Sequence, residues 1–386
     1  MPKKGETPQG DTLMGKGRAQ ERRNMLHGGD IYSVFEKDPE AEKKLVDFSA
    51  NISPLGMPEA VRQAVTAGLD RAVHYPDPKC RTLKDSICRF YMEKRGIFLS
   101  RDMIMCGNGA ADVIYRFVLA MNPKKALLLA PTFAEYEEAL KLTKTSLEFY
   151  FCPKDTLAVQ EDILEKIHKG LDVMFLCNPN NPTGLLTDPG LLKKIIEKTG
   201  RNGVFLVVDE CFLDFSLEED RYSVISDLSQ NKHILVLKSF TKMYGMAGIR
   251  LGYGVCRDRD LVEKMEHQGQ TWPVSTLASE AGTAALLDIN YPEKVRQYVL
   301  REREYLFHAL SRLGIRFWHS HANYILFQLP DPADFYDRML KKGFLIRRCA
   351  NYWGLDETFY RMAVNKHEDN MGFINALEDI IREVSV

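Results

Sequence analysis

Short apolar runs without polar alternation recur between residues 104 and 256, and they constrain the fold more than any other feature. Strands that are buried on both faces have this composition, because helices cover both faces of a parallel sheet. Longer amphipathic stretches separate most of the runs, at 110–121, 134–144, 162–168 and 189–199. The runs span residues 104–106, 126–129, 147–151, 173–176, 204–208, 234–237 and 253–256. Seven such strands with crossover helices predict a large α/β domain with a mainly parallel sheet.

The pattern changes near residue 288, where a second unit is expected to begin. A long helical stretch covers 292–313, short strands are expected at 324–327 and 344–347, and a final helix is expected at 368–383. These elements predict a smaller α+β domain over 288–386, beside a large domain over 57–287. Residues 25–56 are expected to pack against the small domain as an arm. Residues 1–24 are polar and are interpreted as a flexible leader rather than a targeting or nucleic-acid-binding arm.

The charge balance narrows the range of partners. The chain has 52 basic and 53 acidic residues and a net charge of −1, which gives no electrostatic footprint for nucleic acid or a membrane surface. No apolar run approaches the length that crosses a bilayer. The eight cysteines contain no CxxC pair and the nine histidines no HExxH pattern, so no metal site is predicted. We expect a cytoplasmic protein whose partners are small molecules or a second copy of the chain.

A lysine follows directly after one of the predicted buried strands. Lys242 lies within 239–253, which has the sequence SFTKMYGMAGIRLGY. The carboxyl end of a strand in an open α/β sheet faces the crevice where ligands bind, and burial or nearby cations make a lysine there a nucleophile or base. Ser239 and Thr241 offer hydroxyls, and Arg250 offers a donor fork suited to phosphate. Taken alone, Lys242 is better explained as a surface lysine, because lysines are common.

Three other strand ends carry complementary groups. Asp209 ends the strand of the sequence VVDECF, although a helix cap would explain an aspartate equally well. Asn181 lies in NPNNPTG, which by itself is a turn. The sequence CGNGAAD at 106–112 links a fourth strand to a helix, and its glycines suit either an anion cradle or a tight turn. A lysine, a carboxylate, an asparagine and an anion cradle are therefore predicted to converge.

With these motifs in this order, the chain resembles the fold-type I enzymes of the class I/II aminotransferase superfamily, which depend on pyridoxal 5'-phosphate (PLP). It is most similar to the branch that contains histidinol-phosphate aminotransferase and the threonine-phosphate decarboxylases of cobalamin biosynthesis. The resemblance runs from about residue 27 to the C-terminus and rests on NPNNPTG, VVDE, SFTKMYGMAGIRLGY and FYRMAV. It implies the fold-type I architecture, with PLP as the cofactor.

The resemblance also implies a role for each motif residue. Lys242 corresponds to the lysine that holds PLP as a Schiff base, and its freed amine could move protons. Asp209 corresponds to the carboxylate that keeps the pyridine nitrogen protonated, which makes the ring an electron sink. Asn181 would donate to the phenolic oxygen of the ring, and Phe133 would stack on the ring. The residues expected around the cofactor phosphate are Gly109, Ala110, Ala111, Ser239, Thr241 and Arg250.

Two arginines and a tyrosine carry the expectation for the substrate. Arg361, in FYRMAV, corresponds to the arginine that grips the α-carboxylate, although a surface arginine on a strand is the plain alternative. Arg347 matches a second substrate arginine, and a second fixed cation implies a second anion, so the substrate is expected to be a phosphorylated amino acid. Tyr75, in HYPD, corresponds to a tyrosine that crosses a dimer interface to reach the phosphate. This correspondence implies a homodimer with a shared active site.

Three stretches favour the decarboxylases over the aminotransferases of this branch. Residues 26–31, 47–56 and 345–355 resemble threonine-phosphate decarboxylases, and they place His27, Gly28 and Asn51 near the substrate. An ordinary capping or core histidine explains His27 about equally well without the resemblance. Phe212 stands where many aminotransferases of the branch have a tyrosine that donates to the phenolic oxygen, so Asn181 would serve alone or with water. The expected reaction is decarboxylation of O-phospho-L-threonine or O-phospho-L-serine, which differ by one methyl group worth only about 1–3 kcal/mol in a pocket.

Several alternatives remain open at this point. Arg361 would favour transamination if it clamps the carboxylate in the plane of the ring, so histidinol-phosphate aminotransferase is the main competing function. A non-catalytic PLP-binding protein or regulator would need the loss of Lys242 or an added DNA-binding domain, and neither is found in the sequence. A nucleotide-binding oxidoreductase is disfavoured, because no predicted strand is followed by GxGxxG.

Overall fold

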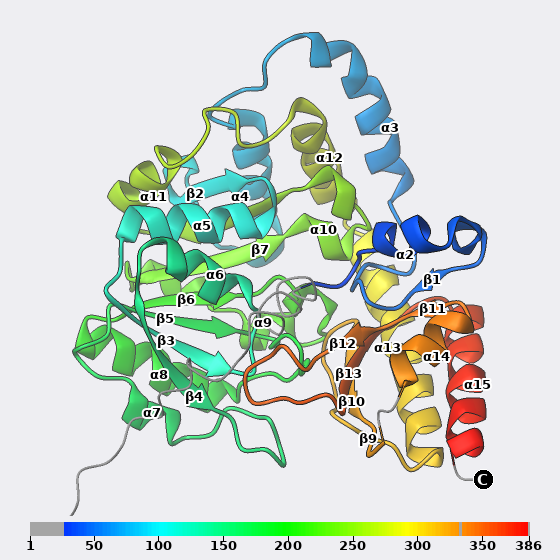
Figure 1. Ribbon diagram of the computed structural model, residues 1–386. Helices are drawn as coiled ribbons and strands as arrows, with labels where there is room; N and C mark the ends of the chain where they lie inside the picture. The colour runs from blue at the N-terminus through cyan, green and yellow to red at the C-terminus, as the bar shows by residue number, and fades with distance from the viewer. Residues whose placement is uncertain (1–26, 332–333, 385–386) are drawn as a thin grey trace, which may run out of the picture.

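The computed structural model describes residues 27–331 and 334–384, and its main feature is a seven-stranded sheet, called the large sheet below (Figure 1). The strand order is β2-β8-β7-β6-β5-β3-β4. Only β8 runs antiparallel to its neighbours, so the predicted α/β class is confirmed, and each of the seven predicted runs forms one strand of the sheet. The strands are β2 (Ile104–Gly107), β3 (Lys125–Ala130), β4 (Ser146–Phe151), β5 (Val173–Cys177), β6 (Phe205–Asp209), β7 (Ile234–Ser239) and β8 (Gly252–Cys256).

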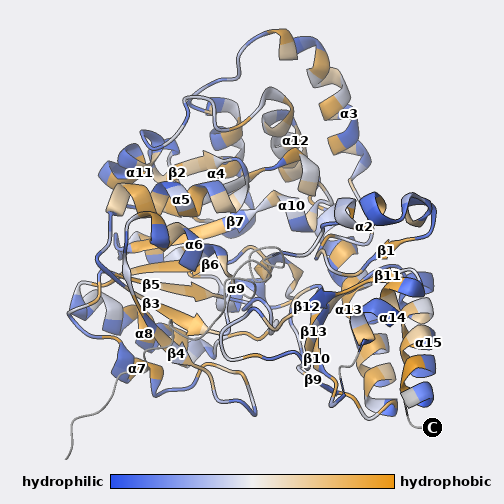
Figure 2. Ribbon diagram, viewed as in Figure 1, coloured by the Kyte–Doolittle hydropathy of each residue, from blue (hydrophilic) through white to orange (hydrophobic). Residues whose placement is uncertain are grey.

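Burial of the large sheet follows the predicted pattern except at one edge. Every residue of β5, β6, β7 and β8 is buried, and Figure 2 shows how hydrophobic the central strands are. The expectation of burial on both faces is wrong for β4, where only Tyr150 is buried and the final residue, Phe151, is exposed. β4 is an edge strand that pairs only with β3, so fewer elements cover it.

Helices connect the strands, and α5 and α6 lie in front of the large sheet in Figure 1. The sequence explains the limits of α8, which the Asp188 side chain caps by accepting from Leu191 N and which ends at Gly203 with a φ of +71°. Pro189 occupies its first turn, where no hydrogen-bond donor is lost. The helices up to residue 287 are α2 (Tyr32–Lys37), α3 (Glu59–Gly68), α4 (Arg81–Arg95), α5 (Gly109–Met121), α6 (Glu135–Leu142), α7 (Ile163–Lys166), α8 (Pro189–Asn202), α9 (Glu219–Tyr222), α10 (Phe240–Met243), α11 (Arg259–Glu266) and α12 (Thr276–Leu287).

A second sheet, called the small sheet below, has the order β12-β13-β10-β9 with antiparallel pairs. The two long helices α13 and α15 pack against each other beside it, together with α14. The single strand predicted at 344–347 is two strands that belong to different sheets, β11 and β12, with Ile346 between them. The elements are β9 (Arg316–Phe317), β10 (Tyr324–Gln328), β11 (Phe344–Leu345), β12 (Arg347–Arg348), β13 (Phe359–Ala363), α13 (Tyr291–Arg312), α14 (Phe335–Lys341) and α15 (His367–Val384).

The segment before residue 57 connects the two sheets. β1 (Val46–Asp47) pairs in parallel with β11, and Ala363 N of the small sheet donates to Phe48 O at 2.8 Å. Further along, Ser53 N donates to Lys242 O at 2.9 Å, so this segment also contacts the turn after β7. The predicted leader, residues 1–24, lies outside the described residues.

Candidate active site at the carboxyl ends of the strands

The carboxyl ends of the parallel strands point toward the small sheet (Figure 1), and Lys242 follows directly after one of them. Lys242 is partly buried, and its Nζ lies 5.7 Å from the centre of the Phe212 ring. Burial, reinforced by Arg361 and Arg250, lowers the pKa of Lys242 to about 8. A lysine with this pKa is partly deprotonated near neutral pH. The deprotonated amine is the form that attacks an aldehyde.

Asp209 is the last residue of β6 and is buried. Its Oδ2 accepts a hydrogen bond from the Tyr136 hydroxyl at 2.6 Å, and its Oδ1 accepts one from Cys211 N at 2.9 Å. Tyr136 itself is buried in α6 and stacks on Phe175, with 4.9 Å between the ring centroids. Sequence reasoning missed Tyr136, although it follows Phe133 by three residues and the two ring centroids are 5.6 Å apart. The two donors hold the carboxylate in a fixed orientation.

The start of α5 lies close to Arg250. Gly109, the first residue of the helix, has a φ of +83°, which favours glycine, and a Cβ at this position would lie 2.7 Å from Arg250 Nη2. Gly252 at the start of β8 is equally confined, because a Cβ there would lie 2.3 Å from Ala110 N. The guanidinium of Arg250 and the first turn of α5 are thus in direct contact.

Two hydroxyls lie near the start of α5. Ser239 is the register partner of Gly252 across β7 and β8, which brings it next to the start of α5. The oxygens Ser239 Oγ and Thr241 Oγ1 are 2.7 Å apart, and Thr241 N donates to Ser239 Oγ at 3.3 Å. A guanidinium, two hydroxyls and the unpaired amides at a helix start are the groups that bind phosphate. The first-turn residues that the sequence predicted for this role are Gly109, Ala110 and Ala111.

Two buried arginines lie opposite each other on the small sheet. Arg347 and Arg361 are register partners in β12 and β13, so their side chains project from one face. Arg361 donates from Nη1 to Asn181 Oδ1 at 2.6 Å and from Nη2 to Ser49 O at 2.8 Å, and Arg347 donates from Nη2 to Asn351 Oδ1 at 2.8 Å. Arg361 Nε is buried and has no hydrogen-bond partner among the described residues. A buried guanidinium with spare donors is suited to bind an anion.

Asn181 connects the large sheet to these arginines. It lies in the loop after β5, and its Oδ1 also accepts from the Tyr352 hydroxyl at 3.4 Å. Because Oδ1 faces the small sheet, the amide nitrogen remains to donate in another direction. Phe133 lies before α6 and contacts the ring of His27, with the centroids 6.0 Å apart.

The N-terminal segment brings three predicted residues to this junction. His27 Nε2 lies 2.6 Å from Glu135 Oε1, and this contact lowers the pKa of Glu135 against the opposing effect of burial. Sequence reasoning did not identify Glu135, because its partner is more than 100 residues away in the chain. Gly28 is packed so closely that a Cβ would lie 2.0 Å from Ser49 O. Asn51 is buried, and its Oδ1 finds no hydrogen-bond partner in the part of the chain that the structure describes.

Tyr75 is a predicted site residue that does not contact the other predicted site residues. Its side chain is exposed and stacks on Trp272, with 4.4 Å between the ring centroids. Within the described ranges, no hydrogen bond or ring contact joins Tyr75 to the residues above. The described ranges contain no group of three His, Cys, Asp or Glu residues that could hold a metal ion. No described helix combines the length and apolarity needed to cross a bilayer.

The contacts described above suit PLP. The close approach of Arg250 to Gly109 would suit the phosphate of the cofactor. The fixed carboxylate of Asp209 suits a protonated ring nitrogen, and the lowered pKa of Lys242 suits attachment of an aldehyde. These three groups therefore suit the phosphate, the ring nitrogen and the aldehyde carbon of the cofactor.

Comparison with known proteins shows the family of the chain. The family model for aminotransferase class I and II matches residues 43–377. The chain is 34% identical over 365 residues to threonine-phosphate decarboxylase of Salmonella typhimurium, covering 94% of this chain and 98% of that protein.

Two solved structures share the fold. The histidinol-phosphate aminotransferase from Clostridium acetobutylicum has a TM-score of 0.81 at 28% identity, covering 88% of this chain and 100% of that one. The L-threonine-O-3-phosphate decarboxylase from Porphyromonas gingivalis has a TM-score of 0.75 at 26% identity, with the same coverage of 88% and 100%. The chain therefore belongs to the class I and II aminotransferase family and depends on PLP as its cofactor.

Proposed function

We propose that this enzyme decarboxylates a phosphorylated L-amino acid, O-phospho-L-threonine or O-phospho-L-serine. The observation that carries the substrate class is the pair of buried arginines, Arg347 and Arg361, on one face of the small sheet, and it suits decarboxylation and transamination equally. Two fixed cations suit a substrate with two anionic groups, here a carboxylate and a phosphate. Threonine-phosphate decarboxylase is also the name of a relative that matches the chain over most of its length. The product would be 1-amino-2-propanol O-phosphate for the side arm of cobalamin, or ethanolamine phosphate.

The residues at the strand ends would divide the binding of the cofactor among them. PLP, when bound, supplies an electron sink, because its protonated pyridine ring accepts the electron pair released at the α-carbon. Asp209, oriented by Tyr136, would keep the ring nitrogen protonated. Lys242 would hold the aldehyde carbon, and Asn181 would donate to the phenolic oxygen. The phosphate would bind to Gly109, Ala110, Ala111, Ser239, Thr241 and Arg250.

The substrate would be held at its two anionic ends. Arg361 would bind the α-carboxylate and Arg347 the phosphate, and His27 with Asn51 would close the site from the N-terminal segment. The bond between the α-carbon and the carboxylate carbon breaks, CO2 leaves, and one proton returns to the α-carbon. The amine of Lys242 would donate this proton, because its pKa of about 8 makes it an acid of suitable strength. No oxidant or reductant is needed.

Transamination on the same site is the second candidate. It is favoured by the structural match to a histidinol-phosphate aminotransferase, whose TM-score of 0.81 exceeds the 0.75 of the decarboxylase. A chemical argument also bears on it, because Arg361 would fix the direction of the α-carboxylate, and that direction would decide whether the bond to hydrogen or the bond to the carboxylate carbon breaks.

A product assay separates the two functions. The PLP-loaded protein is incubated with O-phospho-L-threonine, O-phospho-L-serine or L-histidinol phosphate, each with and without 2-oxoglutarate, and CO2 and glutamate are measured together. The proposal expects CO2 without glutamate from a phospho-amino acid. Glutamate from histidinol phosphate without CO2 would replace it with the aminotransferase function.

The role of Arg347 can be tested with a matched neighbour. Arg347→Gln removes a buried guanidinium, whereas Arg348→Gln removes an exposed one on the same strand. We expect the first substitution to raise KM for the phospho-amino acid on the order of 10- to 100-fold and the second to leave it nearly unchanged. Equal effects of the two substitutions would contradict the assignment of the phosphate to Arg347.

We also propose that the enzyme works as a homodimer. Tyr75 is 79% exposed and stacks on the exposed Trp272, which leaves an aromatic surface without a covering element in the described chain. In the dimer, Tyr75 of one copy would reach the substrate phosphate in the other. Sedimentation analysis should give twice the chain mass, and Tyr75→Ala should raise KM. A monomer with full activity would refute both parts.

A further inference from the structure

The strands that carry Asp209 and Ser239 also carry two buried charges on their opposite side. Glu210 follows Asp209 and Lys238 precedes Ser239, and neighbouring residues of a strand project from opposite faces. Glu210 N donates to Leu237 O at 3.0 Å, which continues the pairing of β6 with β7 by one residue. The Lys238 Nζ lies 3.7 Å from Glu210 Oε2. An ion pair therefore joins the two strands directly behind the candidate cofactor site.

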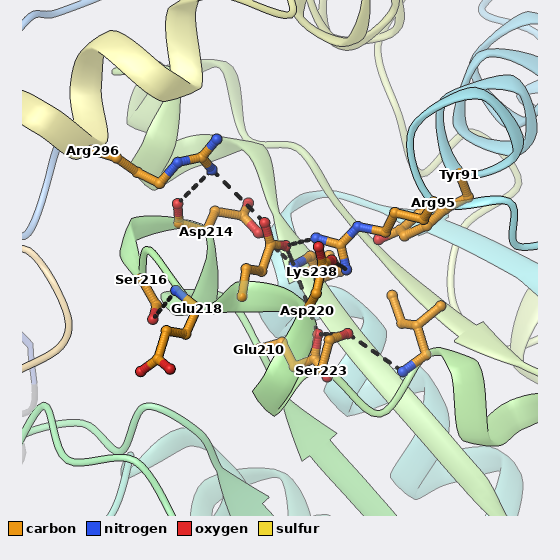
Figure 3. A network of polar contacts seen from close by, with 12 residues as sticks. Tyr91, Arg95, Glu210, Asp214, Ser216, Glu218, Asp220, Ser223, Lys238 and Arg296 are labelled. Carbon is orange, nitrogen blue, oxygen red and sulfur yellow. Dashed lines mark hydrogen bonds and ion pairs between the residues drawn. The ribbon is translucent and has the colours of Figure 1, made fainter. Parts of the chain in front are cut away.

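Further charges surround this pair, as Figure 3 shows. Lys238 Nζ also donates to Glu219 Oε1 at 3.1 Å and to Asp214 Oδ1. Glu210 accepts from Val224 N at 2.7 Å and from Ser223 Oγ at 2.9 Å. Glu210 is fully buried and the Lys238 side chain is 4% exposed, so both charges depend on these partners rather than on water.

Two arginines extend the group to helices on other parts of the chain. Arg95, at the end of α4, lies 2.5 Å from Glu219 Oε1 and 3.3 Å from Asp220 Oδ1. Arg296, in α13, donates from Nη1 to Asp214 O at 3.2 Å and lies 3.8 Å from Glu219 Oε2. The charge cluster below means Arg95, Glu210, Asp214, Glu219, Lys238 and Arg296. All of these except Glu210 line a cavity of about 350 Å³.

The position of Arg296 connects the cluster with the small sheet. α13 packs against α15 and β9, so it is joined to the elements that hold Arg361. Asp214 lies in the 3-10 turn Leu213–Phe215 that follows β6, and Glu219 begins α9 after it. The contact of Arg296 with both residues therefore lies between the small sheet and the strands that end at Asp209 and Ser239.

We propose that the charge cluster is a positioning device for the cofactor site, which holds β6 and β7 in register and fixes the small sheet relative to them through Arg296. The inference rests on the assignment of Asp209 and Ser239 to the cofactor, and it applies to either reaction. A supporting group must hold a site to within about 0.5 Å for full function, and a desolvated ion pair with several partners is less free to shift than an apolar contact. Buried ion pairs add little net stability, so a role in geometry accounts for the cluster better than a role in stability.

The first test uses Lys238 and the binding of PLP. Lys238→Met leaves the three carboxylates without their shared cation, and Lys238→Arg restores the charge. We expect the Met variant to bind PLP on the order of tenfold more weakly, measured by titration of the apoprotein at the absorbance of the bound cofactor, and the Arg variant to recover most of the affinity. Lys194→Met, which removes an exposed ion pair with Glu161, is the matched control and should change nothing.

A second variant covers the case in which Lys238→Met does not fold. Glu210→Gln keeps the size of the side chain and an acceptor oxygen for Val224 N. Its amide NH2 can donate to Ser223 Oγ in place of the hydrogen bond that the carboxylate accepts, and the charge that faces Lys238 is removed. Burial raises the pKa of Glu210 to about 7, so the variant is compared with the wild type at pH 8, where the carboxylate is ionised. It should weaken PLP binding several-fold while circular dichroism of the apoprotein shows a native fold. Unchanged PLP affinity in every folded variant, even with a lower melting temperature, would overturn the proposal and leave the cluster a purely structural feature.

The second test separates the effect of the charge cluster on β6 and β7 from its effect on the small sheet. Arg296→Met leaves Lys238 and Glu210 paired, so PLP affinity should stay near that of the wild type. KM should rise several-fold for whichever of the three phosphorylated compounds the wild-type enzyme turns over, and Arg296→Lys should restore part of the loss. A fall in PLP affinity without a change in KM would contradict the assigned role of Arg296. The PLP affinity and the KM test the proposal in the same way if the enzyme is an aminotransferase.

Discussion

Lys238 and Lys242 lie four residues apart and have opposite surroundings. Burial opposes the charge of Lys238, but Asp214 and Glu219 outweigh this effect and raise the pKa of Lys238 well above its usual value. Around Lys242, burial and the positive charge of Arg361 act in the same direction and lower the pKa to about 8. One lysine is therefore a permanent cation, and the other gives up its proton readily.

The comparison shows that burial alone does not make a lysine reactive. Both side chains are withdrawn from water, and the sign of the neighbouring charges decides whether the proton stays or leaves. The carboxylates of Glu210, Asp214 and Glu219 surround Lys238, whereas the guanidiniums of Arg361 and Arg250 act on Lys242. The same short stretch of chain thus carries a structural cation and a candidate nucleophile.

Loss of Lys242 should have the largest effect on chemistry and almost none on folding. Lys242→Ala removes the group that holds the aldehyde and moves the proton, so turnover should fall at least about 10³-fold. The free energy of unfolding of the apoprotein should stay unchanged or rise, because a partly buried amine without a carboxylate partner is removed. Steady-state assays and urea unfolding measure the two effects. Turnover within tenfold of the wild type would show that Lys242 is not the lysine that reacts.

Loss of Lys238, in contrast to loss of Lys242, should lower the free energy of unfolding. Lys238→Met leaves buried carboxylates without a cation, and the free energy of unfolding of the apoprotein at pH 8 should fall by about 3–5 kcal/mol. The measurement is urea unfolding followed by circular dichroism, with Lys194→Met as the surface control. A loss below about 1 kcal/mol would mean that Lys238 behaves like an exposed ion pair.

Tyr136→Phe should have an intermediate effect, which is a lower affinity for PLP. The substitution removes the 2.6 Å hydrogen bond to Asp209 and keeps the ring that stacks on Phe175. A hydrogen bond to a charged group contributes about 1.5–3 kcal/mol, and part of this should appear as weaker PLP binding. Titration of the apoprotein with PLP measures it. An unchanged affinity would show that Cys211 N alone orients the carboxylate.

The smallest expected effect is a shift in a pH profile. The neutral form of Lys242 attacks PLP, so the rate of cofactor attachment to the apoprotein should rise roughly tenfold per pH unit and level off near pH 8. Arg361→Gln removes a positive neighbour, which raises the pKa of Lys242 and moves the plateau to higher pH. Stopped-flow absorbance at several pH values follows both proteins. A shift to lower pH would contradict the assigned sign.

Much of the fold could be predicted from local sequence. A strand buried on both faces needs an unbroken apolar run, and such runs exist at six of the seven strands of the large sheet, whereas Glu148 interrupts the run at β4. The exposure of β4 could not be predicted, because an edge position depends on strand order rather than on composition. The division of 344–347 into β11 and β12 was also hidden, since each strand takes its partner from a distant part of the chain.

The candidate site was predictable only where motifs lie at strand ends. Lys242 and Asp209 follow buried runs, so their convergence follows from the topology of a parallel sheet. The contact between Asn181 and Arg361 joins residues 180 positions apart, and no local pattern indicates it. Lys238 in an apolar strand was the one visible sign of the charge cluster, because a buried lysine requires carboxylate partners.

The lysine that carries PLP can be identified by chemical labelling. The PLP-loaded enzyme is reduced with borohydride, which fixes the cofactor to its lysine, and the digested peptides are analysed by mass spectrometry. We expect a pyridoxyl group on the peptide that contains both lysines, with fragmentation that assigns it to Lys242 and leaves Lys238 unmodified. A label on Lys238, or on a lysine elsewhere in the chain, would contradict it.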